Sequence, residues 1–295
     1  MGAHLTALLR RQGWKVVVVD NGSVGGVDNL RYLGVDTQIV CADLSDPDAL
    51  RKLGLQPPDV LFHLAGNANV PRSVENPILD FHANVVGTLN VLEYARGNGV
   101  KKVVFPSTAS VYRPGGPMPV GEDAPVQASS PYGAAKVAAE NYCYAYATSY
   151  GLNVTVLRFF NVYGPLMRRF AMHDIVRNLQ KDPTRLEILG DGQQIREYLF
   201  VEDAARAFVV ASEHGLPGQA YNVGTGIPIT IRAVADAVIA AMRLTGVQVE
   251  CTMKSWPGDV KVWYADVSKF ASLGFLPAVG WAEGLHATVT YLTSC

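Results

Sequence analysis

Three side chains in the middle of the chain are of the types that move a proton. Tyr132 and Lys136 are four residues apart, so on a helix they lie on one face, one turn apart. A free tyrosine has a pKa of about 10 and is a poor base near neutral pH, but a nearby ammonium favours the phenolate. Thr108 ends a short apolar run and could hydrogen-bond the same substrate oxygen. These residue types suit proton transfer to and from a hydroxyl group.

The Tyr132 and Lys136 pair also has a structural interpretation, as a polar pair on a helix surface. The chain has 13 tyrosines, and a Tyr-x-x-x-Lys spacing arises by chance in roughly one such chain in three. The surrounding residues favour the functional interpretation. Ser130 and Pro131 directly precede Tyr132 and are typical of a helix start, and Thr108 follows a predicted strand.

The elements that must position these residues alternate along the first half of the chain. Apolar runs rich in branched residues predict strands at 15–19, 38–41, 60–64, 103–105 and 154–157. Helical stretches are predicted at 4–11, 47–53, 79–96 and 132–150. Such alternation is typical of an α/β fold, in which helices cover both faces of a parallel sheet.

The long helical stretches 79–96 and 132–150 leave two packing modes open. Both are rich in small or apolar residues. They could bury a second face against another copy, which predicts a homodimer through a helical bundle. They could equally pack on one side within a monomer.

The pattern becomes less regular after residue 163. Short strands near 186–189 and 247–252 mix with helices near 172–179 and 231–244. We therefore expect a first domain over 1–163 and a smaller domain over 164–295 that completes a cleft, with some of its segments returning to the first domain.

The composition excludes several classes of function. Lys and Arg number 25 against 26 acidic residues, without a long basic run, so neither nucleic acid nor a membrane surface is an expected partner. There is no apolar stretch of membrane-spanning length and no visible secretory signal, which predicts a cytoplasmic protein. The four cysteines are scattered and the six histidines lack ligand spacing, so no disulfide or metal site is expected. His63, inside an apolar run, is expected in the core or at a strand end.

Several further segments occur in an order typical of one family. They are Asp20-Asn21, Ala42-Asp43-Leu44, His63-Leu64-Ala65-Gly66, Asn84-Val85-Val86-Gly87-Thr88, the run 157–165, Gly190-Asp191-Gly192, Arg196-Glu197-Tyr198 and Pro257-Gly258-Asp259. With Thr108, Tyr132 and Lys136 they make the whole chain resemble the extended short-chain dehydrogenase/reductase family, in its nucleotide-sugar epimerase/dehydratase branch, and most of all UDP-galactose 4-epimerase-like proteins. The resemblance implies a Rossmann-like doubly wound parallel sheet with a smaller C-terminal α/β substrate domain.

The start of the chain departs from that family. Its members begin with a strand and a G-x-x-G-x-x-G turn, whose backbone amides and helix start hold the cofactor pyrophosphate. Here Gly2 matches the last glycine alone. We therefore expect a gap beside the strand 15–19, with exposed backbone groups there, in a truncated or mis-started version of a longer protein. The alternative is a chain that folds without the strand and binds the cofactor weakly or not at all.

The resemblance also implies an NAD site. Asp20 closes a strand 18 residues after Gly2, where an acid binds ribose hydroxyls and repels a 2′-phosphate, which favours NAD over NADP. Asp20 could instead form an ordinary turn with Asn21 and Gly22, and Asn84 could be a polar residue on a helix face. The implied cofactor residues are Gly2, Asp20, Asn21, Ser23, Gly25, Asp43, Leu44, Leu64, Ala65, Asn84, Tyr132, Lys136 and Phe159.

The residues after Thr108 distinguish the reactions of the family. The 4,6-dehydratases carry an Asp-Glu pair directly after this threonine, and the decarboxylases usually keep a glutamate two places after it, whereas this chain has Ala109 and Ser110. The resemblance thus implies NAD-dependent epimerisation of a nucleotide-diphosphate sugar at C4. Tyr132 would take the hydroxyl proton, and Lys136 would hold the phenolate and the nicotinamide ribose. The alternatives are a 4-keto-sugar reductase and a non-catalytic scaffold.

The same resemblance gives a substrate set, which is Thr108, Tyr132, Asn161, Arg196 and Asp259. The planar donors of an arginine pair well with phosphate oxygens, although a surface ion pair is the alternative for Arg196. Trp256 stands where many epimerases have arginine. The identities of the nucleotide and the sugar are therefore open at this point.

Overall fold

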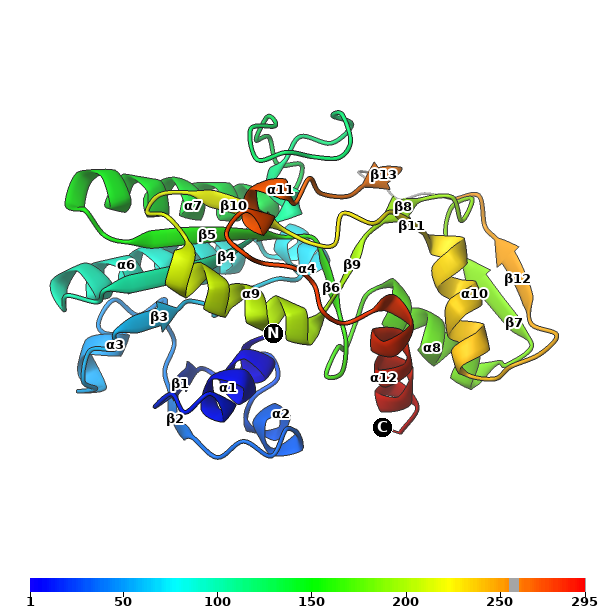
Figure 1. The fold of residues 1–295 in the computed structure, drawn as a ribbon, viewed down its shortest axis with the longest axis horizontal. Helices are drawn as coiled ribbons and strands as arrows, with labels where there is room; N and C mark the ends of the chain where they lie inside the picture. Colours follow the sequence, from blue (N-terminus) through cyan, green and yellow to red (C-terminus); the bar gives the residue numbers. More distant parts are fainter. Residues whose placement is uncertain (255–259, 295) are drawn as a thin grey trace.

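A four-stranded parallel sheet lies at the centre of the larger lobe of the computed structural model, which describes residues 1–254 and 260–294. Its strands are β3 (Val60–Phe62), β4 (Lys102–Thr108), β5 (Val154–Phe159) and β10 (Ala220–Val223). They stand in the order β10-β5-β4-β3, with every neighbouring pair parallel. Strand β10 belongs to the second half of the chain, so that half contributes to the larger lobe (Figure 1).

Helices cover both faces of this sheet. Val103 and Phe105 of β4 pack with α6 (Gly87–Gly97) and α7 (Pro131–Tyr150). Val104, between them, packs in the other core with α1 (Gly2–Arg11) and α9 (Val201–His214). Successive strand residues point to opposite faces, so the apolar run of β4 serves two helical layers. The predicted doubly wound α/β arrangement is confirmed.

Two further parallel strands form a separate small sheet. Within the described residues, β1 (Val17–Asp20) and β2 (Gln38–Cys41) pair with each other alone, and β3 has β4 as its one strand partner. Residues of β1 and of β3 line the same cavity, which has a volume of about 3510 Å³. The gap expected beside the strand 15–19 is therefore present, and Figure 1 shows the β1–β2 pair below β3.

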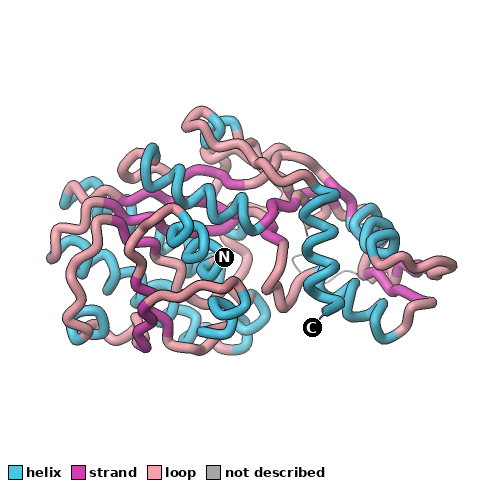
Figure 2. The backbone as a smooth tube through the Cα atoms, turned by 60° about the horizontal axis from the view of Figure 1, so that its bottom comes forward, coloured by secondary structure: helices cyan, strands magenta, loops and turns pink. Residues whose placement is uncertain are grey.

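The smaller lobe gathers three helices and two strands. They are α8 (Ala171–Lys181), α10 (Ile231–Ala241), α12 (Trp281–Ser294), β7 (Arg185–Ile188) and β12 (Gln248–Cys251). Met172, Leu186, Val234 and Leu285 meet in its core. The tube in Figure 2 shows these helices grouped at one end of the molecule, away from the larger lobe.

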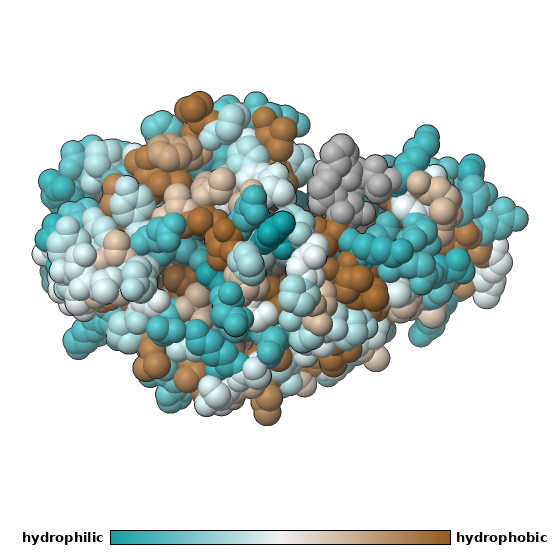
Figure 3. Space-filling model, turned by 90° about the horizontal axis from the view of Figure 1, so that it is seen from above, coloured by the Kyte–Doolittle hydropathy of each residue, from teal (hydrophilic) through white to brown (hydrophobic). Residues whose placement is uncertain are grey.

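Short elements join the two lobes or line the space beside them. These are α2 (Val27–Tyr32), α3 (Ala49–Lys52), α4 (Val70–Glu75), α5 (Pro77–Phe81), β6 (Asn161–Tyr163), β8 (Ile195–Arg196), β9 (Tyr198–Phe200), β11 (Ile229–Thr230), β13 (Val262–Trp263) and α11 (Ser268–Ala271). Strand β6 pairs with β9, while β8 lies between β11 and β13. The face seen from above has hydrophobic residues scattered among hydrophilic ones (Figure 3).

The helical stretch predicted over 79–96 is not one regular helix. It consists of α5, a π-helical turn over His82–Val86, and α6. Such π turns occur often at functional sites, because they re-aim a side chain within a helix. Here the turn contains Asn84, whose side chain is buried.

Two long helices were not expected from the sequence. Helix α9 buries residues on several sides, from Asp203 to Ala211, so it lacks the one-sided apolar stripe by which surface helices are recognised. Helix α12 closes the smaller lobe. In the described part of the chain, no helix combines the length and the apolar character that crossing a bilayer needs.

Candidate active site

Thr108 and Tyr132 lie on one wall of the large cavity. Thr108 is the last residue of β4, and Tyr132 is the second residue of α7. The start of α7 follows from its sequence: Pro131 occupies the first turn, and the Ser130 hydroxyl accepts a hydrogen bond from Gly133 N at 3.1 Å. This cap fixes Tyr132 one residue inside the helix, beside the end of the strand.

Opposing effects act on the pKa of Tyr132. Burial raises it, while the nearby Thr108 hydroxyl and the positive charge of Arg169 lower it. Burial is the largest effect, so the pKa lies above its ordinary value of 10.0. The protein alone therefore holds Tyr132 as a neutral phenol at neutral pH.

Lys136 lies one helical turn from Tyr132, as the spacing requires. Its side chain is buried behind the cavity wall, where Nζ donates a hydrogen bond to Pro106 O at 3.0 Å. Nζ also lies 4.5 Å from the centre of the Phe105 ring. Burial lowers the pKa of Lys136 to about 8, because a desolvated ammonium loses its hydration.

A buried polar cluster adjoins this wall and was not expected from the sequence. Asp80 Oδ1 accepts hydrogen bonds from Asn67 Nδ2 at 2.6 Å and from Asn84 Nδ2 at 2.9 Å. Among the described residues, Asp80 Oδ2 and Asn84 Oδ1 have no partner. Burial raises the pKa of Asp80, and its charge acts on both Tyr132 and Lys136. The one signal in the sequence is an acidic residue within an apolar helical stretch.

Arg169 is a second residue that the sequence did not single out. It lies in the loop between β6 and α8, and its Nη2 donates a hydrogen bond to Ala68 O at 2.8 Å. Leu166 and Phe170, on either side, have φ angles of 70° and 77°, which are uncommon for residues with side chains and occur often at functional sites. The loop thus carries Arg169 into the wall that contains Tyr132.

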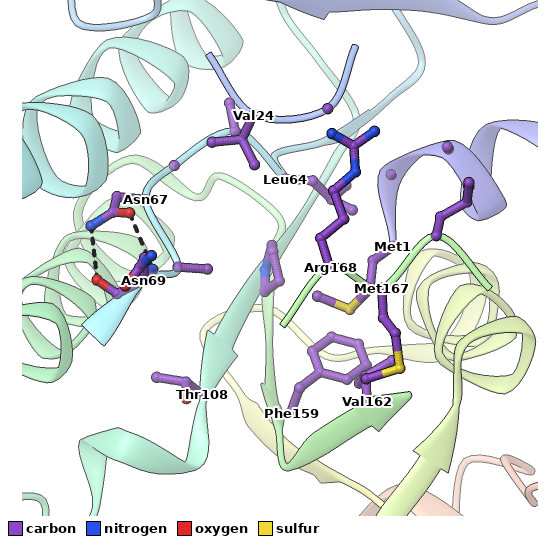
Figure 4. Close-up of a pocket in the computed structure, with 18 of the residues that line it drawn as sticks. Met1, Val24, Leu64, Asn67, Asn69, Thr108, Phe159, Val162, Met167 and Arg168 are labelled. Atoms are coloured by element: carbon purple, nitrogen blue, oxygen red, sulfur yellow. Dashed lines mark hydrogen bonds between the residues drawn. The ribbon is translucent and has the colours of Figure 1, made fainter. Parts of the chain in front are cut away.

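Most of the implied cofactor residues line the cavity, which is seen in close-up in Figure 4. They are Gly2, Asp20, Asn21, Ser23, Gly25, Asp43, Leu44, Leu64, Ala65, Tyr132 and Phe159. Lys136 and Asn84 are buried behind the lining. In Figure 4, Leu64, Phe159 and Met167 come from three segments and lie around one space.

The carboxyl ends of β1 and β2 are tied together at this cavity. Asp20 Oδ1 accepts a hydrogen bond from Gly22 N at 2.7 Å, so the residue forms a local turn as well as lining the cavity. Asn21 Nδ2 donates to Asp43 Oδ2 at 3.0 Å. The pKa of Asp43 lies below its ordinary range, first because the Ser45 side chain donates a hydrogen bond to it.

The donor set at the cavity fits a dinucleotide. An acid at the end of a strand suits ribose hydroxyls, and Leu64 with Phe159 supplies apolar walls for an aromatic ring. Gly66 lets the loop after β3 approach Asn84, because a Cβ there would lie 2.5 Å from Asn84 Oδ1. That oxygen is buried and has no partner among the described residues.

Two further implied substrate residues, Asn161 and Arg196, line the same cavity as Thr108 and Tyr132. Asn161 Nδ2 donates to Glu197 O at 3.0 Å, and Arg196 Nη1 donates to Ile195 O at 2.8 Å. The buried Glu197 carboxylate accepts hydrogen bonds from the backbone N–H groups of Thr225, Gly226 and Ala265. It thereby fixes the short strands that carry Arg196. Asp259 and Trp256 lie outside the described residues.

Comparisons with known proteins agree with this arrangement. Residues 1–224 match the NAD dependent epimerase/dehydratase family. A UDP-glucose 4-epimerase of Mycolicibacterium smegmatis is 36% identical over 299 residues, which cover 99% of this chain and 95% of that protein. A Thermotoga maritima UDP-glucose 4-epimerase crystallised with UDP-glucose is 32% identical, with a TM-score of 0.92 over 99% of this chain and 95% of that one.

A Thermus thermophilus UDP-glucose 4-epimerase in complex with NAD is 31% identical, with a TM-score of 0.88 over 100% of this chain and 96% of that chain. The match thus extends through both lobes. From this match and the geometry of the cavity, we conclude that the chain belongs to the NAD-dependent epimerase/dehydratase family and is an NAD-dependent enzyme of its nucleotide-sugar epimerase class.

Proposed function

We propose that the protein epimerises a nucleotide-diphosphate sugar at C4, of the UDP-glucose and UDP-galactose type, through a 4-keto intermediate. The observation that carries this proposal is the placing of the Thr108 and Tyr132 side chains on the wall of one cavity, close enough for the Thr108 hydroxyl to act on the pKa of Tyr132. Asn161 and Arg196 line the same cavity and suit the nucleotide diphosphate. Relatives named as UDP-glucose 4-epimerases support a uridine nucleotide.

NAD, when bound, exchanges a hydride with the sugar carbon. Tyr132 Oη would remove the proton of the C4 hydroxyl and return it, and the Thr108 hydroxyl would orient the same oxygen. Because burial raises the pKa of Tyr132, the phenolate needs positive charge nearby. In this proposal Lys136 supplies it, together with the residues that hold the cofactor.

In the proposed cofactor site, the carboxylate of Asp20 would bind the adenosine ribose. Asp43 and Leu44 would lie near adenine, and Leu64 and Ala65 along the rest of the dinucleotide. The complete set of proposed cofactor residues is the one that the sequence implied. Asn84 and Lys136 belong to it, although they lie behind the cavity lining.

The sequence after Thr108 favours epimerisation over dehydration or decarboxylation. Ala109 is buried, and Ser110 hydrogen-bonds within the same short turn. Neither is a carboxylic acid, so this segment offers no second acid or base for a neighbouring carbon. Reduction of a 4-keto sugar uses the same residues and is the competing reaction.

We also propose that the chain has two domains that divide at residue 163. We further propose that it forms a homodimer in the cytoplasm. Tyr142 and Tyr144 of α7 are 41% and 59% exposed, and Ile78 and Phe81 of the adjoining α5 are also exposed. Exposed apolar residues on neighbouring helices are typical of an interface. These helices fall within or beside the stretches 79–96 and 132–150, and sedimentation of the purified protein tests the dimer.

The decisive experiment is turnover of UDP-galactose by the purified chain with NAD. We expect UDP-glucose to form with no net NADH, while assay of the denatured protein should release NAD. Stoichiometric loss of NADH with a 4-keto sugar would select the reductase instead. Binding of NAD without conversion of any nucleotide sugar would contradict both reactions.

A further inference from the structure

Arg169 is a cation that nothing in the described chain neutralises. Within residues 1–254 and 260–294 it forms no ion pair with a carboxylate, and its single hydrogen bond goes to Ala68 O at 2.8 Å. Its guanidinium also stacks on the neighbouring Phe170, 4.7 Å from the ring centre. The side chain is half-buried, and burial lowers the pKa of Arg169. A partly desolvated cation without a counter-ion is unfavourable unless a ligand supplies the anion.

A short chain of contacts places Arg169 at the reacting end of the cavity. Ala68, which accepts its hydrogen bond, directly precedes Asn69, the N-cap of α4. One turn into α4, Ser73 Oγ accepts a hydrogen bond from Tyr132 N at 3.1 Å. The charge of Arg169 acts on the Tyr132 hydroxyl. The guanidinium and the phenol therefore belong to the same wall.

The chemistry of a hexose then restricts which anion this cation can meet. In the proposed reaction Tyr132 contacts the hydroxyl on C4. The diphosphate is attached to C1, across the ring from C4, and in the proposed function it lies toward Asn161 and Arg196. The C6 group hangs from C5, the carbon next to C4. A cation beside Tyr132 is thus within reach of the C6 group rather than of the diphosphate.

We propose that Arg169 binds a carboxylate at C6, so that the preferred substrate is a nucleotide uronate rather than a neutral nucleotide hexose. This inference rests on the proposed C4 epimerisation and replaces its neutral hexose with the corresponding uronate as the preferred substrate. The planar guanidinium pairs with both oxygens of a carboxylate. The positive φ angles at Leu166 and Phe170 hold the loop in a conformation that presents Arg169, which agrees with strain stored at a binding site.

Asp80 is an acidic group whose charge acts on Tyr132. Its buried carboxylate accepts hydrogen bonds from Asn67 and Asn84. Arg169 lines the cavity and has no carboxylate partner in the described chain. Arg169 is therefore the group of this wall that would attract the C6 carboxylate.

Calorimetric titration of the NAD-supplemented protein with UDP, UDP-glucose and UDP-glucuronate tests the inference. The wild type should bind UDP-glucuronate most tightly. Arg169→Met should weaken binding of UDP-glucuronate about 10- to 100-fold, the usual effect of losing a charged hydrogen-bonding partner. Binding of UDP and UDP-glucose should change less than about threefold. Arg169→Lys, which keeps the charge without the planar fork, should fall between.

Arg168→Met is the matched control, because it removes one charge from the same loop while Arg168 Nη2 donates to Asn29 Oδ1 at 3.2 Å instead. Its affinity for UDP-glucuronate should equal that of the wild type, and thermal melting checks that each variant is folded. Equal losses for all three ligands in Arg169→Met would mean that Arg169 binds the diphosphate. No loss would mean that it contacts no substrate anion. Either result overturns the inference.

Different experimental results would contradict the inference and the proposed function. Turnover of UDP-glucose with no selective effect of Arg169→Met would leave the epimerase and remove the uronate preference. Selective binding of UDP-glucuronate without turnover of any nucleotide sugar would leave the carboxylate site and remove the epimerase.

Discussion

The Arg158 guanidinium and the Glu140 carboxylate form a buried ion pair, with Nη2 and Oε2 2.7 Å apart. Arg158 belongs to the central strand β5 and Glu140 to α7, the helix that carries Tyr132 and Lys136. Arg158 Nη1 also donates to the Tyr112 hydroxyl at 3.0 Å. The pair therefore sets how α7 lies on the sheet.

Removing one member of this pair should destabilise the protein strongly. Glu140→Gln leaves the Arg158 charge buried without its counter-ion, which typically costs about 3–5 kcal/mol. Urea denaturation measures the loss. Asp59→Asn, which removes the partner of Lys101 in a pair whose side chains are 78% and 79% exposed, is the control and should change stability little. Equal stability of the two variants would contradict a structural role for the buried pair.

Tyr132→Phe should abolish proton transfer while leaving the cavity filled. We expect kcat for UDP-galactose epimerisation to fall by about 10²–10⁴-fold, the usual contribution of general acid–base catalysis, with NAD binding retained. Tyr150→Phe is a control on the same helix, because Tyr150 is 58% exposed at its far end. A Tyr132→Phe variant as active as Tyr150→Phe would remove Tyr132 from the mechanism.

Asp20 should set the preference for NAD over NADP. Its carboxylate stands at the end of β1 in the cavity, where it would bind ribose hydroxyls and repel a 2′-phosphate. Asp20→Ser should weaken NAD binding and reduce the difference between the affinities for NAD and NADP, both measured by fluorescence titration. Asp36→Asn, in the loop before β2, should leave the preference unchanged. A preference unaffected by Asp20→Ser would mean that this carboxylate serves its turn alone.

Lys102 should make stability depend on alkaline pH. Its buried Nζ donates to Asn153, Thr155 and Gly215 O, all neutral acceptors. Burial lowers the pKa of Lys102 from 10.5 to about 8. Between these values the unfolded chain binds more protons than the folded one, so the contribution of Lys102 to the free energy of unfolding rises with pH.

Denaturation of the wild type and of Lys102→Met across this window isolates that effect, because the other titrating groups are common to both proteins. The difference in the free energy of unfolding should shift in favour of the wild type as pH rises from about 8 to about 10.5. A difference that stays flat would show that Lys102 titrates normally in the folded protein.

Local sequence signals anticipated those parts of the site that depend on neighbours along the chain. The placing of Tyr132 follows from the Ser130 cap and Pro131, and the strand that ends at Thr108 follows from its apolar run. Asp80 and Arg169 could not be found in this way. They reach the Tyr132 wall through contacts between segments distant in sequence, and no periodicity records such contacts.

For the fold as well, features that depend on local sequence could be predicted, and features that depend on tertiary packing could not. Alternation of apolar runs and helical stretches predicted the covered parallel sheet. The π turn at Asn84 could not be predicted, since it depends on packing rather than on local propensity. Later segments were expected to return to the first domain, but which strand would join the first sheet could not be predicted. The separation of β1 from β3 agrees with the sequence, in which Gly2 alone matches the glycine-rich turn of the family.

That gap has a consequence for the behaviour of the protein at high concentration. The sides of β1 and β3 that have no strand partner in the described chain carry amide groups that can template pairing with an extended segment of another molecule, and such edges promote aggregation. Amides on these unpaired sides have no ladder partner in the described chain, so in β1 and β3 they should exchange hydrogen for deuterium faster than the amides of β4 and β5. Fast exchange there would mark the space between β1 and β3 as a locally unstable part of the described fold.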